Sequence, residues 1–337
     1  MNDDNDQFAD ALRDLLADHC TVRAVRDIEA GVPATALWET LERSGFADAL
    51  LPEAAGGAGL SLGDAFALFE LCGTFALPVP LAETMVARAL LAAAGIAPPP
   101  GSIALGRLQA EVPADGRAVC ERVACGRTAD WVLATTADGG LLLPTASAER
   151  SEAVFALDAT LSWDAGARAE ARPVPGALDL WSHQACIASA MLSGALMAVF
   201  ERTLQYANDR NQFGRPIGKF QAIQHQLAVM SEHVFAARMA AQIGCHAQGA
   251  TPDRLRVAIA KSRTGQAALE VASLSHSIHG AIGFTAEFDL QIFTRRLHAW
   301  RQVGGSESYW QDVLGTALVD ARGSLALDLI RSTTDVD

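Results

Sequence analysis

The stretch YANDRNQFGRPIGKFQAIQHQLAVM, residues 206–230, joins two helices through a turn that contains glycine and proline. The first helix is expected to end near Arg210, and the second is expected to begin at Gln221. The residues between them break helices and permit a tight reversal of the chain. They include Gly214, Pro216 and Gly218.

Downstream of this turn, apolar residues repeat at helical spacing. From Ile223 to Ala241 they step by 4, 3, 4, 3 and 4 residues, which keeps them on one face of a helix. Such a stripe indicates a helix that packs in a bundle. The stripe consists of Ile223, Leu227, Met230, Val234, Ala237 and Ala241. The helices expected in this region span about residues 178–209, 221–246, 254–280 and 308–322.

The composition and the spacing of apolar residues differ between two further regions of the chain. Residues 1–100 are rich in alanine and leucine at helical spacing, and Ser61, three residues before Asp64, is the expected N-cap of a helix. Residues 101–177 contain short strand-like runs, with a hairpin signal at Asp138-Gly139-Gly140. The sequence therefore predicts a mainly α protein with a small central β domain. The predicted domains are an N-terminal helical domain (1–100), a small β domain (101–177) and a C-terminal four-helix bundle (178–337). The expected strands lie at about 118–120, 131–136, 141–143, 154–157 and 167–172.

Composition and charge exclude several classes of protein. The chain is 50% apolar and carries a net charge of −13, so it repels nucleic-acid phosphates and anionic lipid. Its six cysteines are scattered without metal-ligand spacing, which predicts neither a metal site nor a disulfide framework. The apolar run at 180–200 is interrupted by polar residues and is expected to be a buried helix rather than a membrane span. The expected location is the cytoplasm.

Two segments contain candidate binding residues. The guanidinium of Arg210 is a rigid fork of donors beside the positive end of the next helix, which suits a diphosphate. An ion pair with an acidic neighbour is the simpler alternative for this arginine. The second segment, SHSIHGAIGFTAEFDLQIFTRRLHAW at residues 275–300, has glycines that let a backbone approach a ligand closely. A helix C-cap explains the same glycines.

Together these segments resemble the acyl-CoA dehydrogenase family. The motif RxQFGxPIxxFQ stands at 210–221 and HGxxGF at 279–284, and LWETLERSGFADALLPEAAGGAGLS at 37–61 is similar to the family's opening segment. The resemblance implies FAD-dependent oxidation of the Cα–Cβ bond of an acyl-CoA thioester, in which a glutamate removes the α-proton. It also implies the residues that bind the FAD of a neighbouring subunit. Carried over, these are Arg210, Gln212, Phe213, Gln221, Ser277, His279, Gly280 and Ala281.

The sequence departs from the family's pattern at three places. Ungapped counting from the glycine loop puts Gly304 where the family has its catalytic glutamate. Residues 181–185, where some members carry the base, contain no carboxylate, and residues 102–118 lack the family's flavin-contacting segment. Since glycine cannot accept a proton, no catalytic residue is predicted in this chain.

This combination resembles the short subunits of heteromeric acyl-CoA dehydrogenases of bacterial steroid side-chain degradation. The resemblance implies an FAD-completing, non-catalytic subunit that joins a full-length acyl-CoA dehydrogenase subunit in an α2β2 heterotetramer. It also implies an acyl-CoA substrate and an electron-transfer flavoprotein as acceptor. Two alternatives stay open. One is an active homo-oligomeric enzyme with a non-standard base, for which Glu307 is the candidate; the other is a non-redox binding or scaffold protein on the same fold.

Overall fold

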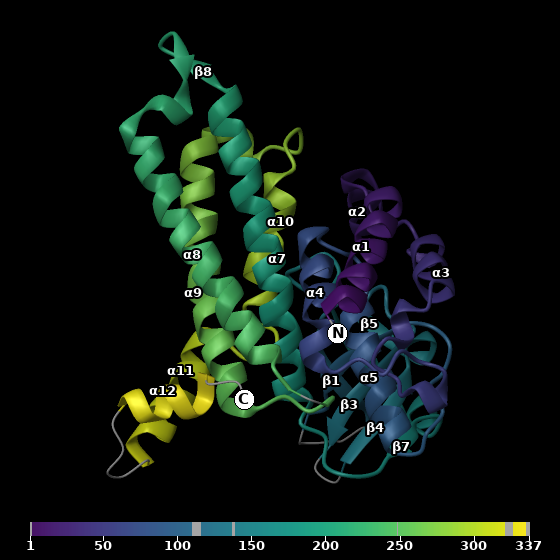
Figure 1. The fold of residues 1–337 in the computed structure, drawn as a ribbon. Helices are drawn as coiled ribbons and strands as arrows, with labels where there is room; N and C mark the ends of the chain where they lie inside the picture. Colours follow the sequence, from purple (N-terminus) through teal and green to yellow (C-terminus); the bar gives the residue numbers. More distant parts are fainter. Residues whose placement is uncertain (1, 110–115, 137–138, 248, 321–325, 335–337) are drawn as a thin grey trace. The chain divides into compact units, whose positions relative to one another are not determined.

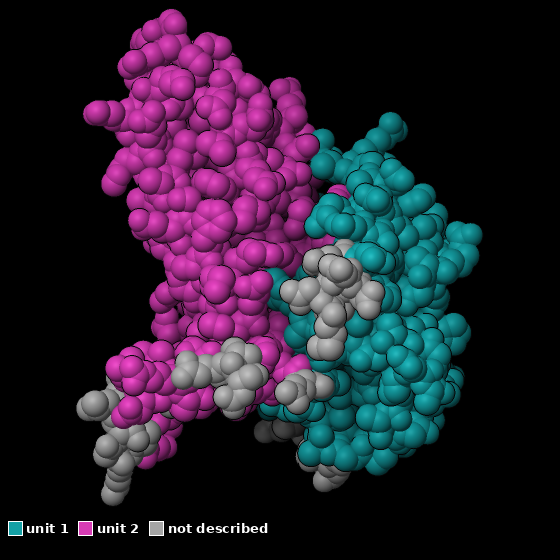
Figure 2. Space-filling view, viewed as in Figure 1, with its two compact units in different colours: residues 1–68, 77–184, 248–251 teal, residues 69–76, 185–247, 252–337 magenta. Residues whose placement is uncertain are grey.

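The computed structural model describes residues 2–109, 116–136, 139–247, 249–320 and 326–334 (Figure 1). The chain divides into two compact units, drawn in teal and magenta in Figure 2. Unit 1 consists of residues 1–68, 77–184 and 248–251, and unit 2 of residues 69–76, 185–247 and 252–337. Helices α4 (Leu62–Thr74) and α7 (Leu180–Asp209) contribute residues to both units. The division into three domains stays a prediction.

Unit 1 opens with short amphipathic helices. Leu12 and Leu16 of α1 (Asn2–His19) are fully buried, as their spacing predicts. The predicted N-cap of α4 is confirmed, because Ser61 Oγ accepts the Asp64 N–H at 3.2 Å. The Asp64 carboxylate accepts the Ser61 N–H at 3.1 Å in return, which completes a capping box. The other helical segments are α2 (Val22–Glu29), α3 (Thr35–Arg43), η1 (Phe46–Asp48), η2 (Glu53–Ala55) and α5 (Leu81–Ala93).

The strands of unit 1 form two small sheets around a buried apolar cluster. Trp163 lies in this cluster, fully buried, and donates its indole N–H to the carbonyl of Pro144 at 2.7 Å. One sheet has the order β1-β3-β4-β7, in which only β1 and β3 are parallel, and the other has the antiparallel order β2-β6-β5. The strands are β1 (Ile103–Arg107), β2 (Ala118–Val123), β3 (Trp131–Thr136), β4 (Gly139–Pro144), β5 (Glu149–Glu152), β6 (Ala159–Trp163) and β7 (Arg172–Val174), with a 3-10 turn η3 (Thr145–Ser147) after β4.

Two predicted strands are wrong. Residues 154–157 form a bend and a turn after β5, and the side chain of Val154 is 93% exposed. Most of 167–172 is not a strand either, because the short helix α6 (Ala165–Arg168) begins after Asp164. The Asp164 carboxylate accepts the Ala167 N–H at 2.8 Å and so caps that helix. The alternation of alanine with charge therefore belongs to a capped helical turn that leads into β7.

Unit 2 is a bundle of long helices. The inward stripe of α8 (Gln221–Cys245) is buried from Leu227 to Ala241, which confirms the predicted packing. The helix α9 (Arg254–His279) begins after Asp253, whose carboxylate accepts the N–H groups of Leu255 at 3.0 Å and Arg256 at 2.9 Å. Gln226 donates to Ser277 Oγ at 3.4 Å, and Gly244 packs against Ala260, so α8 and α9 are antiparallel. Further helical segments are η4 (Ile217–Lys219), η5 (Gly280–Phe284), α10 (Leu290–Trp300), α11 (Glu307–Asp320) and α12 (Ala326–Thr334).

The sequence did not predict α10 as a separate helix, and Gly323, the expected end of α11, lies outside the described residues. By length and composition α7 could cross a membrane, but 83% of its most apolar window is buried in the structure. Buried helices of this kind are common in bundle cores. All six cysteines are buried thiols. The predicted fold class, mainly α with a small sheet region, is confirmed, and the cytoplasmic location stays a prediction.

Candidate functional site

The two motifs meet at one end of the bundle in unit 2. Tyr206, in the last turn of α7, stacks on the ring of His279 with 4.3 Å between the ring centroids. The Tyr206 hydroxyl also donates to the His279 carbonyl at 3.4 Å, across 73 positions of sequence. Together with the bond between Gln226 and Ser277, these contacts bring the end of α7, the start of α8 and the end of α9 together.

A two-stranded hairpin projects from this end, where Figure 1 labels β8. It consists of β8 (Asn211–Gln212) and β9 (Arg215–Pro216). At its tip Phe213 and Gly214 have φ angles of +53° and +80°, the left-handed conformation that a two-residue hairpin turn requires. Phe213 is 92% exposed. A large apolar ring held outward on a tight turn is placed to contact another molecule.

Arg210 and Gln221 lie at the base of the hairpin, and both side chains are exposed. Within the described part of the chain, the guanidinium of Arg210 has neither an ion pair nor a hydrogen bond, so the predicted alternative of an acidic neighbour is not what the structure contains. The residue before α8, Phe220, supplies no side-chain cap to that helix. The Ile223 N–H bonds to the Phe220 carbonyl at 3.0 Å, so the positive end of α8 is presented by the N–H groups of Gln221 and Ala222.

The end of α9 contributes an open stretch of backbone. Gly280 has φ +64°, and a side chain there would meet no atom within 4 Å. Ser277, Gly280 and Ala281 are exposed. His279 differs from them, because its ring is only 4% exposed. Seven of the eight predicted cofactor residues thus lie on the surface of the bundle end, and His279 lies beneath it.

His279 is buried beneath the exposed predicted cofactor residues and contacts the helices that carry them. Its Nδ1 donates to the Ser275 carbonyl at 2.8 Å, and its ring contacts those of Tyr206 and Phe288, which also contact each other. Within the described residues, the buried Nε2 has no hydrogen-bond partner. Burial lowers the pKa of His279, with the charge of His276 acting in the same direction, although the bond to Ser275 opposes them. A neutral ring packed in this cluster of three aromatic rings holds the start of the glycine loop in place.

The predicted position of the missing base has no space for a side chain. Gly304 has φ +65°, and a Cβ built there would lie 2.5 Å from the backbone nitrogen of Ala185 and 2.9 Å from its Cα. The carbonyl of Gly304 accepts the indole N–H of Trp310 at 2.8 Å. This turn is packed against α7 through its backbone, so a glutamate side chain cannot project from it as the turn stands.

Sequence reasoning missed the buried lysine next to this turn. Lys261 is fully buried, and its Nζ donates to the carbonyls of Trp300 at 3.0 Å and Arg301 at 2.8 Å, which end α10. Burial lowers the pKa of Lys261 to about 7. The signal in the sequence was its place at helical spacing from buried residues such as Val257 and Thr264.

Glu307, the candidate alternative base, forms an ion pair with Arg301. Burial acts to raise the pKa of Glu307, but the hydrogen bonds from Arg301 and from its own backbone, with the charges of Arg301 and Lys261, lower it overall. A carboxylate that its ion pair with Arg301 holds ionised is a poor proton acceptor. The geometry therefore disfavours Glu307 as a catalytic base.

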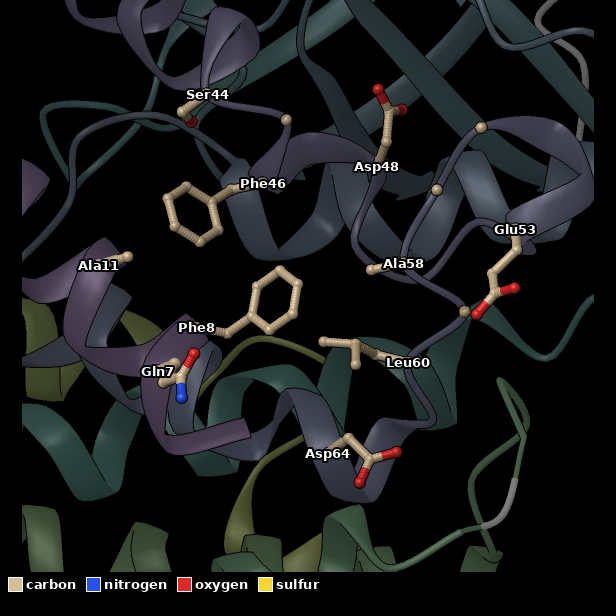
Figure 3. A pocket seen from close by; sticks show the side chains of 14 residues that line it. Gln7, Phe8, Ala11, Ser44, Phe46, Asp48, Glu53, Ala58, Leu60 and Asp64 are labelled. Atoms are coloured by element: carbon tan, nitrogen blue, oxygen red, sulfur yellow. The ribbon is translucent and has the colours of Figure 1, made fainter. Parts of the chain in front are cut away.

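Two surface hollows in unit 1 contain none of these residues. The first has a volume of about 970 Å³ and lies between α1, η1 and the glycine loop before α4. In Figure 3, Phe8, Phe46 and Leu60 point toward one another within it. The second, of about 890 Å³, lies beside Trp38 and Trp131. The candidate site is therefore a surface on the end of the bundle, not a cavity of unit 1.

Known proteins share the sequence and the fold. Residues 2–97 match the family profile described as acyl-CoA dehydrogenase, N-terminal domain, and residues 181–318 match acyl-CoA dehydrogenase, C-terminal domain. The chain is 31% identical over 318 residues to acyl-CoA dehydrogenase IpdE2 of Mycolicibacterium smegmatis. The alignment covers 90% of this chain and 96% of that protein. This chain is 32% identical over 310 residues to IpdE2 of Mycobacterium tuberculosis, with 89% and 93% covered.

Among solved structures, one described as a Tcur3481-Tcur3483 steroid ACAD G363A variant superposes with a TM-score of 0.79 at 25% identity, over 96% of this chain and 99% of that one. The ChsE4-ChsE5 complex from Mycobacterium tuberculosis superposes with a TM-score of 0.78 at 19% identity, over 95% and 98%, which is a likeness of fold. Together the domain matches and the two relatives of nearly equal length establish the family. The chain belongs to the acyl-CoA dehydrogenase family.

Proposed function

We propose that this chain is the FAD-completing, non-catalytic subunit of a heteromeric acyl-CoA dehydrogenase. Its partner is a full-length acyl-CoA dehydrogenase subunit, and the assembly carries out α,β-dehydrogenation of an acyl-CoA thioester. The observation that carries the proposal is the contrast between two places in unit 2. The bundle end presents exposed binding groups around Arg210, whereas the turn at Gly304 has no space for an acid.

The residues of the bundle end fit the diphosphate and adenosine part of FAD. Arg210 and the uncapped start of α8 would neutralise the phosphates, and Gly280 leaves its backbone open to close approach. The outward ring of Phe213 offers an apolar face to the cofactor or to the partner chain. When bound, FAD supplies the acceptor for the hydride that leaves Cβ of the substrate. The proton acceptor for the α-carbon comes from the partner.

The names of related proteins support the assembly and the substrate class. The steroid ACAD of similar fold is described by two chain names, and so is the ChsE4-ChsE5 complex. By analogy we propose an α2β2 heterotetramer with one FAD for each pair of unlike chains, a steroid-derived acyl-CoA substrate, and an electron-transfer flavoprotein as acceptor.

Co-expression with a full-length acyl-CoA dehydrogenase subunit from the same organism tests the proposal. The pair should purify as a yellow, active heteromer with one FAD per pair of unlike chains, whereas this chain alone should hold little flavin. Arg210→Ala should leave the heteromer assembled but remove most of its FAD. The matched control is Arg23→Ala, because Arg23 is an exposed arginine of unit 1 with a 91% exposed side chain.

The two alternatives give different results in the same experiment. An active, flavin-loaded homo-oligomer from single expression would refute the non-catalytic role and revive Glu307 as a base. Assembly without flavin under every condition would favour the scaffold protein. Equal FAD content in the Arg210→Ala and Arg23→Ala heteromers would show that the bundle end does not hold the cofactor.

A further inference from the structure

Two buried cysteines lie in contact within unit 2. Cys186 lies near the start of α7, Cys245 is the last residue of α8, and both are fully buried. Their sulfur atoms are 3.3 Å apart, and one thiol donates a hydrogen bond to the other. Because 59 positions of sequence separate the two residues, it is the fold that brings them together. The contact joins the start of α7 to the end of α8.

Small residues around the pair let the helices approach closely. The Cys186 sulfur lies 3.5 Å from the carbonyl oxygen of Gly244, and a Cβ built at Gly244 would meet Ala260 of α9 at 2.4 Å. After Cys245 the backbone leaves the helix, since His246 is extended. The end of a helix is held by fewer backbone hydrogen bonds than its interior, so Cys245 can shift toward Cys186 more easily than a residue in the middle of α8.

The two sulfur atoms are close to the geometry of a disulfide. A disulfide bond is about 2.05 Å long, so the atoms have to approach by about 1.3 Å. Rotation of the two side chains with a small shift of the helix end is enough for this distance. A covalent bond between Cys186 and Cys245 therefore requires no rearrangement of the bundle.

We propose that Cys186 and Cys245 form a site of reversible thiol oxidation, at which hydrogen peroxide converts the two thiols to an intrachain disulfide. One thiol attacks the peroxide, becomes a sulfenic acid and releases water. The other thiol attacks the sulfenic sulfur and releases a second water as the S–S bond forms. The two sulfur atoms together lose two electrons, which the peroxide takes up, and a dithiol reductant reverses the change.

The surroundings of the pair select a small, uncharged oxidant. The hydrogen bond with Cys186 raises the pKa of the Cys245 thiol well above its ordinary value, and burial and the charge of Glu70 act in the same direction. Because the thiolate is the reactive form, the pair should react more slowly than an exposed thiol. Full burial excludes a bulky disulfide such as oxidised glutathione, whereas hydrogen peroxide is small enough to enter.

A disulfide at this place would brace the part of α7 on which the Gly304 turn rests. Ala185, whose backbone lies against Gly304, directly precedes Cys186. The predicted cofactor residue Gln221 lies at the other end of α8, about 36 Å away along the helix. The bond should therefore stabilise unit 2 and leave the cofactor residues unchanged, so this proposal does not depend on the proposed function.

Peroxide treatment of the folded full chain, followed by peptide mapping without a reducing agent, tests the proposal. The wild type should yield a linked peptide that contains Cys186 and Cys245, with a loss of about 2 Da in the intact mass, and dithiothreitol should reverse both. The equilibrium constant for unfolding should fall roughly 100-fold in the linked chain. Cys186→Ala should abolish the link. The matched control Cys120→Ala removes another fully buried thiol, whose pKa burial raises to about 12, and should leave the link unchanged.

The wild-type map alone can overturn the proposal, even if a variant fails to fold. Sulfinic or sulfonic acid at Cys186 or Cys245 without a link would show that the sulfur atoms cannot meet. No reaction at a peroxide concentration that oxidises the urea-unfolded chain would show that the pair is inert. A link that includes any other cysteine instead, or one that persists in Cys186→Ala, would refute the pairing. A linked chain whose heteromer holds no FAD would support the oxidation site and refute the proposed function.

Discussion

Replacing Gly304 by alanine should cost more stability than its backbone angle alone explains. The residue has φ +65°, where an alanine is strained, and its α-carbon lies against the backbone of Ala185 in α7. A new methyl group there would sit 2.5 Å from the Ala185 nitrogen and 2.9 Å from its Cα. Because the obstacle is helix backbone rather than a flexible side chain, one of the two segments has to move.

The two costs can be estimated separately. Holding an alanine in the left-handed region costs about 1–2 kcal/mol. Forcing an extra methyl group into a packed interior adds about 1–3 kcal/mol through the shift of its neighbours. Gly304→Ala should therefore lower the free energy of unfolding by about 2–5 kcal/mol. Gly304→Glu should do at least as much damage and should restore no activity.

Gly214→Ala is the matched control for this prediction. Gly214 also belongs to unit 2 and has φ +80°, but no atom lies within 4 Å of its Cβ position. Gly214→Ala should therefore lower the free energy of unfolding only by the cost of its backbone angle. The change in conformational entropy of the unfolded chain is the same in both variants. Urea unfolding followed by far-ultraviolet circular dichroism measures both losses. If the two variants agree within about 0.5 kcal/mol, the turn has room for a side chain, and the argument against an acid at Gly304 fails.

Three further changes test the groups around the site and the fold. Lys261→Met probes the buried amine: the folded chain has a pKa of about 7 there against an ordinary 10.5, so it binds fewer protons than the unfolded chain between these values. The free energy of unfolding of the wild type should therefore rise by about 2 kcal/mol from pH 7 to pH 9 and fall again when the pH is lowered. Urea titrations of Lys261→Met at both pH values should find no such gain. Ser61→Ala should cost about 1 kcal/mol by removing the capping box of α4, measured by the same unfolding assay. Glu307→Gln should destabilise unit 2 by about 1–3 kcal/mol because Arg301 loses its ion-pair partner, yet turnover per folded heteromer should stay within about twofold. Abolished turnover in a folded Glu307→Gln heteromer would identify it as the base.

Local patterns in the sequence predicted most of the fold. The inward stripe of α8 and the cap at Ser61 depend on residues a few positions apart, so spacing alone was sufficient. The errors came where a single side chain decided between two local structures. The capping bond of Asp164 turned an expected strand into α6, whereas α10 begins without a side-chain capping bond from Asp289 that would mark its start.

The candidate site shows a different limit. The motif residues could be named in advance, but their meeting at one end of the bundle depends on contacts between segments that are distant in sequence, such as Tyr206 with His279. The burial of His279 could not be predicted from its motif, since the same letters fit an exposed ligand. The burial of Lys261 could be inferred from its helical spacing, but its role depends on the two carbonyls that it binds, which end a helix about 40 residues downstream.

The lack of a base at Gly304 depends on more than one side chain. Lys261 holds the carbonyls that end α10, Trp310 binds the carbonyl of Gly304, and the α-carbon of Gly304 rests on Ala185. Each of these contacts fixes backbone, so the turn would have to be rebuilt before any residue at this position could point an acid toward a substrate. A glutamate inserted by a single substitution would disrupt packing instead of supplying a proton acceptor. That is the physical reason to expect the acceptor on another chain.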